Sequence, residues 1–160
     1  MGTQTLMTFA DSNSSVVLYD SRTSHAPGSL GRIARFVAVN SAVEVDLAGR
    51  VNAEMPGHRH VSGVGGSADF VESGFGSAGG LSVIALTSTT RHGHSRIAPA
   101  RSSPVVTMPR HASDVLATEW GVVRLAGATL RERAEALITV AHPHHRAPLA
   151  QEQNELREQH

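Results

Sequence analysis

Alternating apolar and polar residues predict strands in the middle of this chain. Apolar residues gather at 33–39, which we expect to form a buried strand, and valine and leucine then alternate with acidic residues at 43–47. Gly49 can supply the positive φ of a tight turn. Residues 43–52 are therefore predicted to form a β-hairpin.

Other apolar runs predict further strands. The continuous run LSVIAL at 81–86 is typical of a strand that is covered on both faces. Shorter strands are expected at 104–108 and 114–120, and the run at 16–19 is compatible with another. Residues 56–80 hold much of the chain's glycine, so we predict a long loop there.

A helix is predicted to begin after Thr129, because TLRE is a capping box. The threonine hydroxyl can accept from the third backbone N–H of the helix, while Glu132 reaches back to the cap. Pro143 is expected to end this helix, and residues 148–160 are predicted to form a polar terminal helix or a frayed tail. One face of the predicted helix carries Leu130, Ala134, Leu137, Ile138 and Ala141.

These elements indicate an α/β fold with an open, mixed sheet and flanking helices. A length of 160 residues suits one compact domain. We divide the chain into a weakly determined N-terminal segment at 1–31, the domain proper at 32–147 and the C-terminal part at 148–160. In open α/β sheets, ligands bind at the carboxyl ends of the strands.

Charge and cysteine content narrow the classes of function. Acidic and basic residues balance at 14 each, which gives no reason to expect nucleic acid or an anionic membrane surface as a partner. The absence of cysteine removes a disulfide framework, a thiolate metal site and a cysteine nucleophile, and no stretch is apolar for the length that a bilayer needs. We therefore expect a cytoplasmic protein without a membrane or nucleic-acid partner.

The segment GVGGSADF at 63–70 is a candidate ligand loop. Small residues let the backbone approach a ligand closely, and consecutive N–H groups can form an anion or oxyanion site. The spacing matches neither Gly-x-Gly-x-x-Gly nor a Walker A motif, so a nucleotide site of those kinds is a poor interpretation. From these residues alone, a plain loop is favoured over a ligand loop.

The histidines invite a metal hypothesis, but we predict no metal site. Metal ions need ligands that converge at fixed distances, and the helical His-x-x-x-His spacing is absent. Exposed histidines that bind no metal are the favoured interpretation for the three groups, which are His58 with His60, His92 with His94, and His142 with His144 and His145.

Two polar residues at strand ends are candidate site residues. Glu119 ends an apolar run, where it is either an acid or orienting group in a site or a solvated carboxylate. Asn40 ends another apolar run and either caps a turn or faces a ligand carbonyl. No Gly-x-Ser-x-Gly elbow is present, so a hydrolytic triad cannot be argued from serine, histidine and aspartate alone.

Several motifs in fixed order resemble the C-terminal domain of the acetyl-CoA hydrolase/transferase family, which includes 4-hydroxybutyrate and acetate CoA-transferases. The resemblance runs from about Phe36 to Arg146 and rests on FVAVNSAVEVDLAGRVNAE, SGVGGSADF, GGLSVIALTSTT, SRIAP, TMPRHASDVLATEWGVVRLAG and LRERAEALITVAHPHHR. The opening MGTQTLMTFADSNSSV is similar to an internal stretch of the family. We therefore expect Met1 to match an internal position of a longer two-domain enzyme.

The resemblance implies a CoA-transferase-like α/β fold and a covalent mechanism. Family members attack an acyl-CoA with a glutamate and form a glutamyl-CoA thioester that a second carboxylate resolves. That glutamate belongs to a segment upstream of the matching region. The family resemblance gives Glu119, in ATEWG, a supporting role rather than that of the nucleophile. It also implies that the amide of Asn40 helps to stabilise the thioester oxyanion.

The resemblance also implies contacts with coenzyme A, which is a substrate here and not a resident cofactor. Arg91 stands where the family usually has a lysine near the CoA phosphates, Leu81 stands where a lysine is frequent, and His92 replaces a glycine. The segment that would wrap the pantetheine and thioester end of CoA with its backbone contributes Gly63, Val64, Gly65, Gly66, Ser67 and Asp69.

Three hypotheses follow, in this order. The first is the CoA-binding C-terminal half of a CoA-transferase, which acts on an acyl-CoA and a short carboxylate and is inactive without its N-terminal half. That half, or a second copy of the chain, is the expected protein partner. The second is a non-catalytic acyl-CoA binding module or an inactive remnant. The third is a metal-dependent hydrolase that uses the histidine groups.

Overall fold

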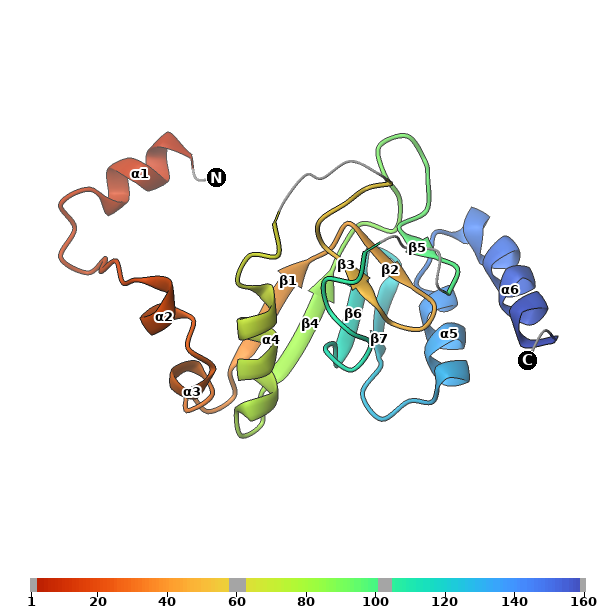
Figure 1. Ribbon diagram of the computed structural model, residues 1–160. Helices are drawn as coiled ribbons and strands as arrows, with labels where there is room; N and C mark the ends of the chain where they lie inside the picture. The colour runs from red at the N-terminus through yellow and green to blue at the C-terminus, as the bar shows by residue number, and fades with distance from the viewer. Residues whose placement is uncertain (1–2, 58–62, 101–104, 159–160) are drawn as a thin grey trace.

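The computed structural model of this chain describes residues 3–57, 63–100 and 105–158. Its helices are α1 (Gln4–Ala10), α2 (Ser21–Ser24), α3 (Pro27–Leu30), α4 (Ser67–Gly76), α5 (Leu130–Thr139) and α6 (Pro143–Glu158) (Figure 1). Its strands are β1 (Val37–Ser41), β2 (Glu44–Asp46), β3 (Val51–Asn52), β4 (Leu81–Ala85), β5 (Ile97–Ala98), β6 (Val115–Thr118) and β7 (Gly121–Arg124).

The larger sheet has the order β1-β4-β6-β7 and is mixed. Strands β1, β4 and β6 are parallel, and β7 runs antiparallel to β6. The predicted fold class, an open mixed α/β sheet with flanking helices, is confirmed. Strand β7 was not predicted from the sequence, because only the two residues Glu119 and Trp120 separate it from β6.

A second sheet, of order β3-β2-β5, lies beside the first. The predicted hairpin is confirmed as the antiparallel pair β2–β3, and Gly49 has a φ of 86° in its turn. Asp46 is fully buried and closes this turn, because its Oδ1 atom accepts from the backbone N–H groups of Ala48 and Arg50, each at 3.0 Å. The guanidinium of Arg50 neutralises the buried carboxylate, with Nε 2.7 Å from Oδ2.

Two predicted strands are wrong in the part of the chain that the structure describes. The run at 16–19 is irregular, and Leu18 is almost fully exposed with no sheet beside it. Of the strand predicted at 104–108, only Met108 pairs, through a single bridge to Val51. Met108 is buried in the core, so the apolar residues at 104–108 indicated burial and not a paired strand.

The glycine-rich region was predicted to be a loop, but residues 67–76 form α4. Val71 and Gly74 are buried on the side of α4 that faces β1 and β4. The prediction failed because the glycines at 74 and 76 masked the helical spacing of the apolar residues. Gly74 is needed here because it lies against β4: a Cβ on it would be 3.0 Å from the carbonyl oxygen of Leu81.

Strand β4 confirms the strand predicted at 81–86 but not its burial on both faces. Ser82 and Ile84 are buried, whereas Leu81, Val83 and Ala85 are only half-buried. One side of β4 faces the core, and the other side lacks a covering layer in the described chain.

The hydrophobic core lies between the inner face of the larger sheet, the smaller sheet and the helices α5 and α6. Its fully buried large side chains are Val45, Leu47, Val51, Ile84, Ile97, Met108, Leu116, Leu125 and Leu137.

The capping box that was predicted before α5 is confirmed. Thr129 accepts from the backbone N–H of Glu132, and Glu132 accepts from that of Thr129. Pro143 does not end α5, which stops at Thr139, but opens α6, where proline is favoured because the first N–H of a helix has no intrahelical partner. The C-terminal helix therefore begins five residues before the predicted 148.

Residues 3–31, which we call the arm, extend away from the sheets (Figure 1). Helix α1 buries none of its residues. The arm contacts the body through α3, which lies beside α4, and through the ring of His25, which is 4.8 Å from that of Phe70 on α4.

Gly80→Ala is expected to destabilise the fold, because a Cβ there would overlap the carbonyl oxygen of Gly74 and lie 2.6 Å from the Cβ of Ser77. Overpacking against backbone costs about 1–3 kcal/mol. Gly76→Ala is the matched control, since nothing lies within 4 Å of its added Cβ, and it should stabilise α4 by up to about 1 kcal/mol. Urea unfolding measures both changes, and equal effects of the two substitutions would contradict the prediction.

Candidate functional site

The candidate site residues gather at the carboxyl edge of the larger sheet. Strands β1, β4 and β6 are parallel, so their carboxyl ends lie at the same edge. Helix α4 follows the β2–β3 hairpin, packs on β1 and β4 and leads into the amino end of β4, so its N-terminus lies at the carboxyl edge (Figure 1). This edge is where open α/β sheets bind ligands.

Asn40 lies near the end of β1, opposite Ile84 of β4. Its Nδ2 atom is buried but has no hydrogen-bond partner among the described residues. A buried amide donor without a partner is unfavourable, so such groups call for an explanation. In Asn52, by contrast, the amide group is fully used: it donates to the carbonyl of Met55 at 2.6 Å and accepts from two backbone N–H groups.

Glu119 lies in the turn after β6 and is held by the loop that follows β4. The backbone N–H of Ser88 donates to Oε2 at 2.8 Å, and the Ser88 hydroxyl donates to Oε1 at 2.6 Å. Trp120 Nε1 in turn donates to the Ser88 hydroxyl oxygen at 3.1 Å. Both carboxylate oxygens of Glu119 are therefore engaged.

The pKa of Glu119 is lowered from its ordinary value. The main cause is the hydrogen bond from the Ser88 hydroxyl, which burial opposes, with smaller contributions from the backbone N–H of Ser88 and from the neighbouring His142. The ring of His142 lies 5.3 Å from that of Trp120, edge to face. The Arg146 guanidinium lies 6.0 Å from the same indole ring. Glu119 is thus a fixed, ionised acceptor at neutral pH.

The segment GVGGSADF forms the approach to α4 and its first turn. Gly65 has a φ of 61°, and Gly66 is the N-cap. Gly63 and Val64 precede the helix and are exposed, whereas Ser67 and Asp69 lie within it, which corrects the prediction that they belong to a loop. The first backbone N–H groups of α4 point toward the carboxyl edge of the sheet.

Arg91 lies in the loop that joins β4 to β5, and it is exposed. Its Nε atom donates to Nε2 of His92 at 3.1 Å. The loop is closed by a bridge between Thr89 and Ser95. His145 on α6 donates through Nε2 to the carbonyl of Gly93 at 2.9 Å, so the C-terminal helix helps to hold this loop in place.

The histidine groups form no metal site among the described residues. Within 3–57, 63–100 and 105–158, no three histidine, aspartate or glutamate side chains lie close enough together to hold a metal ion. His58 and His60 lie outside the described residues. Among the described helices, none combines the length and the apolar composition needed to span a bilayer.

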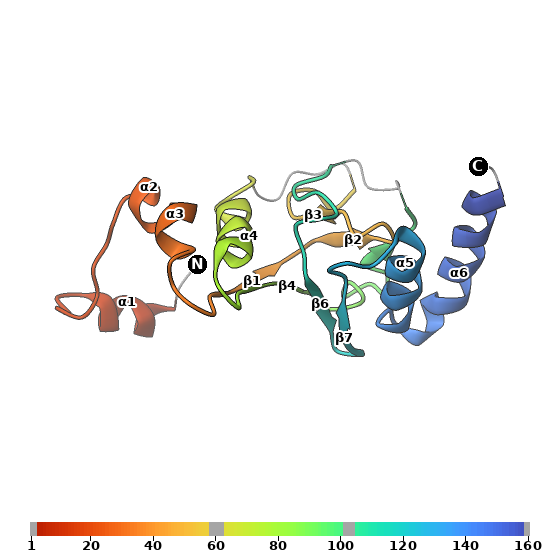
Figure 2. The ribbon, with the colours of Figure 1, turned by 90° about the horizontal axis from the view of Figure 1, so that it is seen from below.

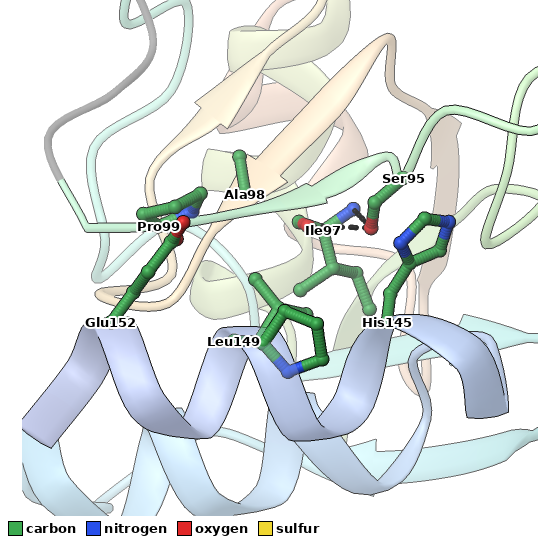
Figure 3. A pocket seen from close by; sticks show the side chains of 8 residues that line it. Ser95, Ile97, Ala98, Pro99, His145, Leu149 and Glu152 are labelled. Carbon is green, nitrogen blue, oxygen red and sulfur yellow. Dashed lines mark hydrogen bonds between the residues drawn. The ribbon is translucent and has the colours of Figure 1, made fainter.

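A hollow of about 210 Å³ lies between β5 and α6 (Figure 3). His145, Leu149 and Glu152 project into it from α6, opposite Ile97 and Pro99 (Figure 3). It is smaller than most ligand sites and contains none of the predicted site residues. The candidate site is instead the open edge that carries Asn40, the N-terminus of α4, Arg91 and Glu119.

Three residues of this edge, Ser88, Trp120 and His142, were not among the predicted site residues. Ser88 is one of many serines and threonines in a polar stretch, so its sequence carries no distinguishing signal. Trp120 is the one tryptophan of the chain and directly follows Glu119, which is a usable signal. His142 becomes part of the cluster only because α6 begins where the sequence predicted that a helix ends.

Known proteins resemble this chain in sequence. The 4-hydroxybutyrate coenzyme A transferase of Clostridium kluyveri is 41% identical over 95% of this chain. The probable butyrate:acetyl-CoA coenzyme A-transferase of Syntrophomonas wolfei is 40% identical over 95% of this chain. The chain spans 35–36% of the length of these relatives.

Solved structures show the same fold. A point mutant of RipA superposes with a TM-score of 0.91 at 32% identity, over 98% of this chain and 36% of that one. RipA from Yersinia pestis matches over 83% of this chain and 30% of that one, with a TM-score of 0.76 and 36% identity. A 4-hydroxybutyrate CoA-transferase from Porphyromonas gingivalis matches over 99% of this chain and 36% of that one, with a TM-score of 0.76 and 34% identity.

The family model for the acetyl-CoA hydrolase/transferase C-terminal domain matches residues 2–153. With that match and relatives of 40% identity, the chain belongs to the acetyl-CoA hydrolase/transferase family, of which it contains the C-terminal domain.

Proposed function

We propose that this chain is the CoA-binding part of a CoA-transferase that exchanges CoA between an acyl-CoA and a short carboxylate such as acetate. The observation that carries the proposal is the gathering of Asn40, the N-terminus of α4, the Arg91 loop and Glu119 at one edge of the sheet, in a chain of this family.

The thioester end of CoA would lie between Asn40 and the N-terminus of α4. The unpartnered Nδ2 of Asn40 is a donor without a structural use in the described chain, so it can serve the oxyanion that forms when the thioester is attacked. The N–H groups at the start of α4 supply further donors, and Gly65 leaves room for close approach, because nothing lies within 4 Å of where its Cβ would be. Arg91 is free to reach a CoA phosphate because its side chain is exposed.

Glu119 is assigned a positioning role and not that of the nucleophile. A nucleophilic carboxylate needs an oxygen free to attack, whereas both oxygens of Glu119 accept hydrogen bonds from Ser88. Asn40 is level with Leu116, two strands away across β4, and Glu119 comes three residues after Leu116, so the two side chains are farther apart than two strand spacings of about 4.8 Å each. Glu119 therefore shapes the side of the site away from Asn40 and keeps the β4–β5 loop in place.

The nucleophilic glutamate is assigned to the portion of the enzyme that precedes this region in the relatives. That portion is the expected protein partner, either in one polypeptide or as a separate chain. The location we propose is cytoplasmic, in keeping with the absence of cysteine. The alternative function is that of an acyl-CoA binding module without catalytic activity, or an inactive remnant. Its support is that the chain spans only about a third of its relatives.

Titration calorimetry with CoA and acetyl-CoA tests the proposed binding. Arg91→Ala is expected to weaken CoA binding roughly three- to tenfold, because an exposed charge-assisted contact to phosphate is lost. Arg131→Ala is the control, since this equally exposed arginine lies on α5 and pairs only with Glu135 there. The absence of heat for both ligands would leave the inactive remnant, and binding without activity in the assembled enzyme would favour the binding module.

Asn40→Ala is expected to change stability by no more than about 1 kcal/mol, because its buried Nδ2 has no hydrogen bond to lose. Asn52→Ala should cost about 2–4 kcal/mol, because it leaves three backbone groups without their partner. Urea unfolding compares the two asparagines. In the assembled enzyme, Asn40→Ala should lower kcat about 100-fold, as loss of an oxyanion donor does. An unchanged kcat would remove Asn40 from the site.

Ser88→Ala is expected to return the pKa of Glu119 toward its ordinary value, because the hydroxyl is the main cause of the lowered pKa. A carboxylate with a lowered pKa stabilises the fold above its ordinary pKa, and this contribution is lost as the pH falls through the folded-state value. The wild-type chain should therefore keep this contribution at neutral pH and lose it as the pH falls through the lowered pKa of Glu119, whereas Ser88→Ala should lack most of it at neutral pH. A carboxyl ¹³C NMR titration measures the pKa, and Thr87→Ala, whose hydroxyl donates to the carbonyl of Thr89, should leave it unchanged.

A further inference from the structure

We infer that His25 of the arm is a further residue of the CoA site, where its Nε2 atom accepts a hydrogen bond from an amide N–H of the pantetheine chain of CoA. The inference rests on the proposed function and adds a side chain that was not among the predicted site residues. Its support is the position of the imidazole ring, the hydrogen bond that fixes the tautomer of the ring, and the chemistry of the neighbouring helix terminus.

The arm brings His25 to the N-terminus of α4. Its helix α3 lies beside α4 in both views (Figure 1, Figure 2), and the short helix α2 ends at His25. The imidazole ring lies 4.8 Å from the ring of Phe70 and fills the space beside Gly66, the N-cap of α4. A Cβ on Gly66 would be 3.0 Å from Nε2, so this nitrogen lies at the start of the helix.

The hydroxyl of Ser24 fixes the tautomer of the ring. It lies 2.8 Å from Nδ1 of His25 and donates to the carbonyl oxygen of Asp20 at 3.0 Å. A carbonyl can only accept, so the single hydroxyl proton goes to Asp20, and the hydroxyl oxygen accepts from Nδ1–H of His25. In the neutral ring, this tautomer leaves a lone pair on Nε2. Nε2 is therefore an acceptor that is held in a fixed direction.

This acceptor has no structural use in the described chain. Nε2 of His25 makes no hydrogen bond within 3–57, 63–100 and 105–158. The ring is half-buried, so part of it is open to solvent. Packing against Phe70 accounts for an aromatic ring at this position but not for the nitrogen, because a phenyl ring would make the same contact.

The start of α4 presents donors that lack partners. Gly66, as the N-cap, has no side chain to accept from the first N–H groups of the helix, and the buried Nδ2 of Asn40 adds a further donor at this edge. Such donors suit the carbonyl oxygens of the pantetheine amides. Each of these amides also carries an N–H group that needs an acceptor, and Nε2 of His25 supplies one beside the donors. An amide of CoA is then recognised at both its oxygen and its N–H.

The carboxylate of Asp69 is the competing acceptor, because it also lies in the first turn of α4. A carboxylate at this position already has a structural explanation, since it interacts favourably with the positive end of the helix dipole. Its negative charge also opposes the approach of the CoA phosphates. Nε2 of His25 has neither that explanation nor that charge in the neutral ring. We therefore commit to His25.

Titration calorimetry of the complete 160-residue chain with CoA and with adenosine 3′,5′-bisphosphate tests the inference. The second probe carries the base and phosphates but lacks the pantetheine chain. His25→Phe should weaken CoA binding roughly three- to tenfold, because one hydrogen bond is lost while the ring against Phe70 is kept. Its affinity for the bisphosphate should be unchanged. His25→Gln, whose side-chain oxygen can accept in place of Nε2, should stay within about twofold of the wild-type affinity for CoA.

Arg91→Ala is the matched contrast, since the loss of a phosphate contact should weaken binding of both probes. Thermal unfolding checks that each variant keeps the fold. A ¹H–¹⁵N NMR spectrum of the ring nitrogens should identify the Nδ1–H tautomer of His25 in the chain alone. CoA should then shift the Nε2 resonance, whereas the bisphosphate should leave it in place.

Unchanged CoA affinity in His25→Phe would overturn the inference and leave the proposed function standing. An equal loss for both probes would also overturn it, because the contact would then involve a phosphate or the whole helix terminus. A CoA affinity that falls with Asp69→Ala but not with His25→Phe would transfer the role to Asp69. An Nε2–H tautomer in the free chain would likewise contradict the inference. Absence of CoA binding to the wild-type chain would refute the proposed function, and the inference with it.

Discussion

The parallel pairing of β4 with both β1 and β6 is the constraint on which the rest of the structure depends. It places Asn40 opposite Ile84 and Ala85 opposite Ala117. Beyond these pairs, the loop after β4 and the turn after β6 meet where the hydroxyl of Ser88 donates to Glu119. Because side chains alternate along a strand, a shift of one residue in β1 would turn Asn40 to the other face. The site is therefore specified by strand register.

Helix α4 depends on the same strand. Gly74 and Gly80 allow its last turn to lie against the backbone of β4. A side chain at either position would force the neighbouring atoms to move. The helix axis is thus fixed at the amino end of the strands, while its first turn, with Gly65 and Gly66, lies at the opposite edge. Two small residues at one end of the molecule position the backbone N–H groups at the other.

Sequence patterns predicted the parts of the fold in which local signals and tertiary packing agree. The hairpin turn at Gly49 and the capping box at Thr129 are short-range signals, and both are found in the structure. Helix α4 was missed because glycines required for its packing resemble those of a loop. Strand β7 was missed because only Glu119 and Trp120 separate it from β6.

The candidate site also has residues that local sequence patterns predicted and contacts that they did not. The positions of Asn40 and Glu119 at strand ends were evident from the sequence, and topology brings them to one edge. The Ser88 contact was not evident, because a hydrogen bond between residues 31 positions apart depends on strand order that no local pattern records. Family resemblance supplied the roles, whereas the structure supplied the engaged state of Glu119 and the unpartnered amide of Asn40.

The position of His25 links the arm to the N-terminus of α4. Its ring lies against Phe70 on α4 and occupies the space that a Cβ on Gly66 would need, so the arm is in contact with the N-cap of the helix at the carboxyl edge of the larger sheet. Whatever orders the arm therefore also orders that N-cap. Under the proposed function, thermodynamic linkage requires that ordering of the arm and binding of CoA at this edge change each other's equilibrium by the same factor.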